Sequence, residues 1–243
     1  MPKVAIVLSG CGVFDGSEIH EAVSLLVHLS RAGVQSHCFA PDAPQAHVID
    51  HLKQAPTGES RNILVESARI ARGSIKQLAQ LKAQDFDAVF FPGGFGAAKN
   101  LCDFATAGHA CTVTPEVERV LHAFHSASKP IGMCCIAPVI AARVFGKAKG
   151  GPGCSVTIGD DPATAQAIAQ MGSQNVATPV NRAHVDASNR LVTAPAYMYD
   201  APVHEVFDGI GEMVRHTLAL IGAPGRGSQG GIQQAAAAGT ALA

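Results

Sequence analysis

Short aliphatic runs alternate with segments of helical periodicity along most of the chain, and this alternation constrains the fold more than any other feature. The runs are continuously apolar, which is typical of strands buried on both faces of a parallel sheet. Repeated strand–helix–strand units predict an α/β domain with a doubly wound parallel sheet and helices on both faces. The predicted strands are 3–8, 34–40, 87–91, 130–134, 156–158 and 190–193, and the predicted helices are 19–32, one or two within 62–84, 115–127, 138–145, 162–171 and 203–220.

The pattern also predicts how the chain is divided. Residues 1–222 are expected to form one domain, with an irregular polar excursion over residues 41–60. From residue 223 to residue 243 the chain is rich in Gly, Gln and Ala and has no periodic apolar face. We therefore expect a loosely attached tail over 223–243.

Charge and hydropathy exclude several classes of partner. The chain has 18 basic and 19 acidic residues and no basic stretch, so neither nucleic acid nor an anionic membrane is an expected partner. No apolar run approaches the length of a membrane-spanning helix. The apolar run 4–8 is too short for a signal peptide and is interpreted as the first strand, which predicts a cytoplasmic protein.

The cysteines do not form a recognisable framework. There are seven, an odd number, and no C-x-x-C pair occurs, so neither a disulfide framework nor a cysteine-rich zinc site is expected. We predict no metal and no cofactor. Most of these thiols are expected to be small buried side chains.

Cys135 is the exception, because of where it lies. The predicted strand 130–134 runs directly into a helix with Pro138 in its first turn, so Cys135 is expected on a sharp turn. Such an elbow holds a nucleophile above the edge of a sheet. The adjoining helix N-terminus is expected to favour the thiolate and lower its pKa. Cys134, still inside the strand, is interpreted as a core residue.

A glycine-rich turn follows another strand. Gly93 and Gly94 follow the predicted strand 87–91, and without a Cβ their N–H groups can approach a bound oxygen. The N–H of Gly94, together with that of Ile136 just after the cysteine, would form an oxyanion hole. The alternative is simply a tight turn, since glycine-rich turns after strands are common.

An acid/base group is expected beside the first strand. Glu18 and Glu21 lie in the opening turns of the first helix. Glu18 fits an ordinary capping carboxylate, whereas Glu21 is less easily explained as a cap and could point at the neighbouring strand end. None of the 11 histidines compels a catalytic role. His184 and His204, downstream of the cysteine, are weak candidates for its partner.

Five motifs stand out along the chain, at residues 9–18, 61–73, 92–101, 130–138 and 189–198. Together they make the sequence resemble the ElbB family. These are the isoprenoid-biosynthesis, or enhancing-lycopene-biosynthesis, proteins of the ThiJ/PfpI, class I glutamine amidotransferase-like superfamily, whose fold is flavodoxin-like. The resemblance covers about the first 220 residues. It implies Cys135 as nucleophile, Glu21 as its carboxylate partner, and Gly94 and Ile136 as oxyanion donors.

The resemblance also implies an activity. It predicts a cofactor-independent glyoxalase, a lyase that converts glyoxal or a related 2-oxoaldehyde to the 2-hydroxy acid, and a homodimer. Amidotransferases carry a catalytic histidine after the cysteine, and the corresponding stretch 154–159 contains none. Two alternatives remain: a thiol hydrolase or deglycase acting on aldehyde adducts, and a non-catalytic redox-sensing regulator. The segment 61–72 is interpreted either as a solvated ion-pair face or as a lid.

Overall fold

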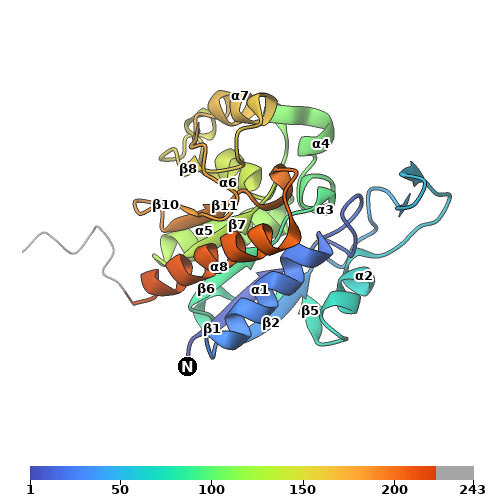
Figure 1. The fold of residues 1–243 in the computed structure, drawn as a ribbon, viewed down its shortest axis with the longest axis horizontal. Coiled ribbons are helices and arrows are strands. Elements are labelled where there is room, and N and C mark those ends of the chain that lie inside the picture. The colour runs from blue at the N-terminus through green and yellow to red at the C-terminus, as the bar shows by residue number, and fades with distance from the viewer. Residues whose placement is uncertain (223–243) are drawn as a thin grey trace, which may run out of the picture.

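Seven strands form one central sheet in the order β10-β11-β7-β6-β1-β2-β5 (Figure 1). The structure is a computed structural model and describes residues 1–222. All neighbouring pairs in this sheet are parallel except β10 with β11. The strands are β1 (Lys3–Val7), β2 (Gln35–Ala40), β5 (Ile75–Gln77), β6 (Ala88–Phe91), β7 (Ile131–Cys134), β10 (His184–Asp186) and β11 (Leu191–Ala194). Two short pairs lie outside the sheet: β3 (Ile49–Asp50) with β4 (Ala55–Pro56), and β8 (Ser155–Val156) with β9 (Gln174–Asn175).

Helices cover both faces of the sheet. Helices α1 and α8 pack side by side over one face (Figure 1), and α5 and α6 pack on the other. The predicted doubly wound class is therefore confirmed, with one antiparallel edge strand added. The helices are α1 (Ile19–Arg31), α2 (Ile63–Ile70), α3 (Phe95–Lys99), α4 (Phe104–Ala107), α5 (Pro115–Ser126), α6 (Pro138–Phe145), α7 (Pro162–Gln170) and α8 (Val203–Leu220).

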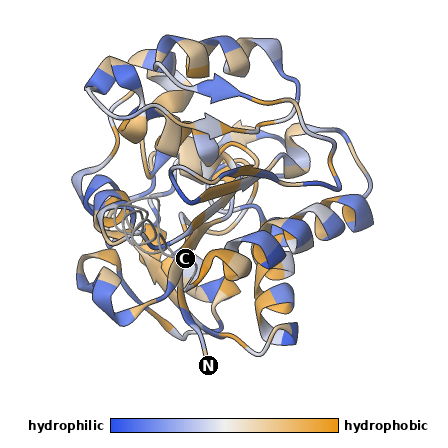
Figure 2. Cartoon of the chain, turned by 90° about the vertical axis from the view of Figure 1, so that its left-hand side faces the viewer, coloured by the Kyte–Doolittle hydropathy of each residue, from blue (hydrophilic) through white to orange (hydrophobic). Residues whose placement is uncertain are grey.

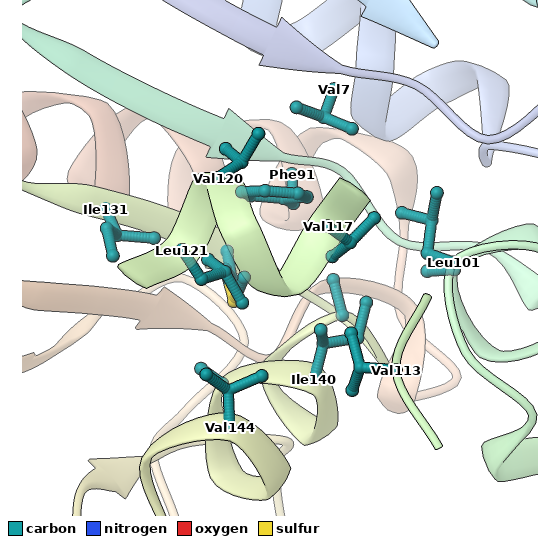
Figure 3. Packing of buried hydrophobic residues seen from close by; sticks show 14 of the residues in the cluster. Val7, Phe91, Leu101, Val113, Val117, Val120, Leu121, Ile131, Ile140 and Val144 are labelled. Carbon is teal, nitrogen blue, oxygen red and sulfur yellow. The ribbon is translucent and has the colours of Figure 1, made fainter. Parts of the chain in front are cut away.

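Two hydrophobic cores follow from the alternation of side chains along each strand. Phe90 and Phe91 are adjacent in β6, and both are fully buried, yet they belong to different cores. Phe91 packs with Val117 and Val120 of α5 (Figure 3), whereas Phe90 belongs to the core beneath α1 and α8. Figure 2 shows orange, hydrophobic colouring along the strands at the centre of the molecule, while the helices carry both orange and blue turns. Burial on both faces explains why the strands are continuously apolar.

The segment 62–84 is only partly the helical region that the sequence predicts. Helix α2 ends at Ile70, and Ile75–Gln77 then joins the sheet beside β2. This edge strand is short and contains Lys76 and Gln77, so it lacks the aliphatic run that identifies a central strand. The antiparallel edge strand β10 was not predicted either, because it too is short and lacks an aliphatic run. The predicted tail, 223–243, lies outside the described residues.

The strand order sets the position of the functional site. The chain moves from β1 to β2 in one direction and later returns to place β6 on the other side of β1. A crevice forms outside the carboxyl ends of the strands at such a switch point. The turns after β1, β6, β7 and β11 therefore meet at one edge. Within residues 1–222, no helix is both long and apolar enough to cross a membrane.

Candidate active site

Cys135 lies on the sharp turn that its sequence position predicts. Its φ of 59° is in the left-handed region, which few residues other than glycine adopt. The backbone N–H of Cys135 donates to the carbonyl of Ala194 at 3.0 Å, which ties the turn to the end of β11. Helix α6 begins three residues later, at Pro138. The surrounding structure therefore holds a strained backbone at this cysteine, as is common for residues with a function.

Glu21 reaches this turn from the first turn of α1. Its side chain is fully buried, and it interacts with the Cys135 thiol. The Gly93 N–H donates to its Oε2 at 2.9 Å, and the Tyr197 N–H is 3.4 Å from its Oε1. A Cβ at Gly93 would meet both the Cys135 Cβ and the Glu21 Oε2, so no larger residue fits between the two groups. The structure thus brings Cys135 and Glu21 together as an adjacent pair.

The environment of Glu21 makes it a carboxyl that titrates near neutral pH. Burial raises its pKa from the ordinary 4.5 to about 7, and the nearby Glu18 carboxylate adds to the rise. The hydrogen bonds from Cys135, Tyr197 and Gly93 act in the opposite direction but do not offset it. Glu18 itself is the N-cap of α1, and its Oε2 accepts the Glu21 N–H at 2.7 Å. Its interpretation as a capping residue is confirmed.

The Cys135 thiol does not have the lowered pKa that the helix N-terminus predicts. Burial raises its pKa well above the usual 9.0, and the negative charge of Glu21 raises it further. The N–H groups of Gly94 and Ile136 lower this pKa, but they do not outweigh burial. The resting thiol is therefore protonated, and it needs a base when it attacks. Glu21 is the carboxylate placed to accept that proton.

Gly94 and Ile136 present backbone donors to the same sulfur. Both N–H groups interact with the Cys135 thiol, one from the turn after β6 and the other from the start of the α6 segment. Gly94 has a φ of 90°, and a Cβ there would meet the backbone of Gly16 and Glu18 at 2.4 Å. Only glycine fits at this position. Two donors at the reacting sulfur are also well placed for an oxygen on the attacked carbon.

A cavity of about 400 Å³ opens over this group. Cys135, Gly94 and Ile136 line it, together with residues from α3, α4, the start of α7 and the 3₁₀ turn Ala196–Met198. Glu21 is buried beneath the lining and reaches the cavity through Cys135. The arrangement can expose one thiol to a small electrophile while a buried carboxyl moves protons behind it.

The neighbouring cysteine and the two candidate histidines occupy other positions. Cys134 is fully buried in β7 and does not line the cavity, but its thiol donates a hydrogen bond to the Glu21 Oε2 at 3.7 Å. His184 pairs with the hydroxyl of Ser155 at 2.8 Å, and His204 is exposed at the start of α8. Neither histidine lines the cavity.

Three residues near the cavity were not predicted from the sequence as part of the site. Tyr197 and Asp161 line it, and His20 joins Tyr197 through a 2.9 Å contact between its Nδ1 and the phenol oxygen. Tyr197 lies within the motif 189–198, which was its only signal. Asp161 carries an N-cap signature, and its Oδ2 accepts the Thr164 N–H at 2.7 Å. A capping pattern in the sequence does not show that the capping residue, Asp161, also lines a cavity.

The segment 61–72 supports the ion-pair interpretation in part. Glu66 is bound by Arg69 at 2.8 Å and approached by Arg61 at 3.5 Å. Arg72 lies beyond the end of α2, so it does not share this face. None of these residues lines the cavity at Cys135.

A larger and more open hollow of about 580 Å³ lies elsewhere on the molecule. Its buried carboxylate, Asp186, accepts backbone N–H groups from Ser155, Ser188 and Asn189. The Asp186 carboxylate is thus occupied in stabilising a turn. We therefore place the chemistry at Cys135 rather than in this larger hollow.

Comparison with known proteins identifies curated relatives of this chain. No protein-family model matches the chain. The chain is 55% identical over 230 residues to "glutamine amidotransferase-like class 1 domain-containing protein 3, mitochondrial" from Homo sapiens. It is 54% identical over 230 residues to "ES1 protein homolog, mitochondrial" from Rattus norvegicus. Each match covers 90% of this chain and 84% of the relative.

A solved structure extends the comparison. The isoprenoid biosynthesis protein with amidotransferase-like domain from Ehrlichia chaffeensis superposes with a TM-score of 0.84 at 38% identity. The match covers 90% of this chain and 99% of that one. Together with the strand order and the cysteine elbow, it defines a class I glutamine amidotransferase-like α/β protein. Within that class, the chain belongs to the ElbB/ES1 family of the ThiJ/PfpI superfamily.

The relatives also correct one prediction. The expectation of a cytoplasmic protein is wrong on this comparison, because the human and rat relatives are both named mitochondrial. Composition and charge carried no information that could have separated these two compartments.

Proposed function

We propose that this protein is a cofactor-independent glyoxalase, a lyase that converts a 2-oxoaldehyde to the 2-hydroxy acid with Cys135 as nucleophile and Glu21 as acid/base. The observation that carries the proposal is the contact between a cavity-lining thiol and a fully buried carboxyl with a pKa of about 7. A group with this pKa can both take and return a proton at neutral pH.

The reaction starts when the ionised Glu21 takes the proton of the Cys135 thiol as sulfur attacks the aldehyde carbon. The oxygen of that carbon gains negative charge, which the N–H groups of Gly94 and Ile136 stabilise until Glu21 returns the thiol proton to it. This transfer gives the hemithioacetal and leaves Glu21 ionised again. Both donors already interact with the sulfur before substrate binds.

Proton movement between the two carbons completes the rearrangement. The ionised Glu21 removes the proton from the carbon bonded to sulfur and delivers it to the oxygen of the neighbouring carbonyl, which gives an enediol. It then takes the proton of the hydroxyl beside the sulfur and places it on the neighbouring carbon. The product of these two steps is a thioester of the 2-hydroxy acid. Water then cleaves the carbon–sulfur bond, releases the acid and restores the thiol, so one water is consumed for each aldehyde and no oxidant is needed.

Three further points belong to this proposal. The missing histidine in the stretch 154–159 and the position of His184 disfavour an amidotransferase-type Cys–His pair. Hydrolysis of aldehyde adducts is a second candidate, since the same thiol could attack them. Assembly as a homodimer rests on the family resemblance alone.

The experiment that tests this proposal is a product assay. Purified protein, incubated with glyoxal in the absence of glutathione, is expected to form glycolate in proportion to the enzyme added. A parallel incubation with an aldehyde–amine adduct is followed for released amine. Glycolate formation supports the glyoxalase, amine release without glycolate supports the hydrolase, and no product from either substrate would contradict both.

A further inference from the structure

The cavity over Cys135 is much larger than the simplest 2-oxoaldehyde requires. Its volume of about 400 Å³ is in the range of pockets that hold drug-sized ligands. At about 30 Å³ per water molecule, such a space holds on the order of ten waters. Glyoxal has only four heavy atoms and would leave most of the cavity filled with solvent.

The wall of the cavity is mainly apolar. Phe104 and Ala105 come from α4, Phe95 from α3, and Ile136 and Met198 from the turns beside the nucleophile. An apolar substituent on the substrate would displace water from these side chains, and burying it contributes about 25 cal/mol per Å². This wall therefore favours substrates larger and less polar than glyoxal.

The charges that line the cavity are all negative. Glu18 and Asp161 are its ionisable carboxylates, and no Lys, Arg or His is among the described residues that line it. Two basic groups next to lining residues already have partners. His20 contacts the Tyr197 hydroxyl at 2.9 Å, and its Nδ1 lies 3.9 Å from the Glu18 Oε1. The Lys99 Nζ donates to the Phe14 carbonyl at 3.0 Å and lies over the Phe95 ring, 5.1 Å from its centroid.

A negatively charged substituent would therefore lose its hydration without gaining a cationic partner. It would also lie near two carboxylates of the same sign, which adds repulsion in a partly desolvated space. Such a site discriminates against anions by repulsion as well as selecting for apolar groups.

From the volume, apolar wall and charge of this cavity, and given the glyoxalase function above, we propose that the preferred substrates are 2-oxoaldehydes bearing an uncharged apolar substituent, and that carboxylate-bearing aldehydes are rejected. The kinetic test compares glyoxal, phenylglyoxal and 4-carboxyphenylglyoxal, the last two differing only in the carboxylate. We expect phenylglyoxal to have a kcat/KM at least about tenfold above that of each of the other two. Equal values for the two aryl substrates, or glyoxal as the best of the three, would overturn the proposal.

A second measurement tests the cavity without any turnover. The rates at which N-phenyliodoacetamide, iodoacetamide and iodoacetate alkylate Cys135 are followed by peptide mass spectrometry, each divided by its rate with free glutathione. We expect the phenyl reagent to be the fastest and iodoacetate the slowest, with at least a tenfold difference between iodoacetate and iodoacetamide. Equal normalised rates for the charged and neutral reagents would overturn the proposal.

Two substitutions give the matched comparison. Asp161→Asn removes a cavity charge while an asparagine can still cap α7, and it is expected to raise the relative rate of iodoacetate several-fold. Asp160→Asn makes the same change at the adjacent exposed residue, which does not line the cavity, and should have a smaller effect. Equal effects of the two would count against the cavity as the source of selectivity. If the reagents show the expected order but no aldehyde is turned over, the glyoxalase function fails and the cavity's selectivity stands.

Discussion

Replacing Glu21 with Gln is expected to make the protein more stable at pH 8, by up to about 3 kcal/mol, while reducing turnover by about 10²- to 10⁴-fold. The stability gain arises because wild-type protein must ionise a fully buried carboxyl whose pKa is raised from 4.5 to about 7. Glutamine keeps an oxygen for the Gly93 N–H and carries no charge. The turnover loss arises because glutamine can neither accept nor return a proton.

The sign of the pH dependence follows from the two pKa values. Below pH 4.5 the carboxyl is neutral in both the folded and the unfolded chain, so it causes no difference in stability. Between pH 4.5 and about 7 the folded chain binds the proton more tightly, and wild-type stability falls relative to the variant as pH rises. Above pH 7 the difference is fully developed.

Urea denaturation of both proteins across this pH range checks the expectation. Glu59→Gln is a suitable control, because that carboxylate is 58% exposed. We expect the control to change the free energy of unfolding by less than about 1 kcal/mol at every pH. A Glu21→Gln variant that is less stable than wild type at pH 8 would contradict the buried, high-pKa carboxyl.

Replacing Cys135 with Ala is expected to reduce glyoxal turnover at least about a thousandfold, since the variant has no nucleophile. The fold should survive, because the change removes one small atom from a side chain at the wall of a cavity and costs about 1–2 kcal/mol. Initial rates of glycolate formation and the far-UV circular dichroism spectrum are the measurements.

Cys134→Ala is the matched control for this variant. It removes the adjacent thiol, which is buried in β7 and does not line the cavity. We expect it to retain turnover within about tenfold of wild type, with some loss because its Sγ lies 3.7 Å from the Glu21 Oε2. Equal rates for wild type and Cys135→Ala would exclude the nucleophile, whatever Cys134→Ala does.

Much of the fold follows from local patterns in the sequence. The central strands were predicted because they are continuous aliphatic runs, and α6 and α8 were predicted with the bounds that the structure has. Edge strands β5 and β10 were not predicted. One face or edge of each is solvated, and their sequences, IKQ and HVD, contain no aliphatic run. Their pairing depends on tertiary contacts rather than on local preference.

The candidate site likewise contains residues that local sequence patterns predict and residues that they do not. Cys135 could be found because a strand, a cysteine and a helix-starting proline are adjacent in the sequence, and this spacing leaves the cysteine on the turn. The pKa of its thiol could not be predicted, since it depends on burial beneath α1 and on the charge of Glu21, far away in the chain. Tyr197 and Asp161 were missed because only the folded chain brings their segments to the cavity.

The central claim is that Cys135 and Glu21 act as one unit, and the most direct test is the double variant. Groups that act as a unit are not additive, because once the nucleophile is gone its base has nothing left to activate. We predict that Cys135→Ala/Glu21→Gln converts glyoxal to glycolate at the same residual rate as Cys135→Ala alone. A double variant that loses the product of the two single losses would show that the two residues act independently, and would contradict the account.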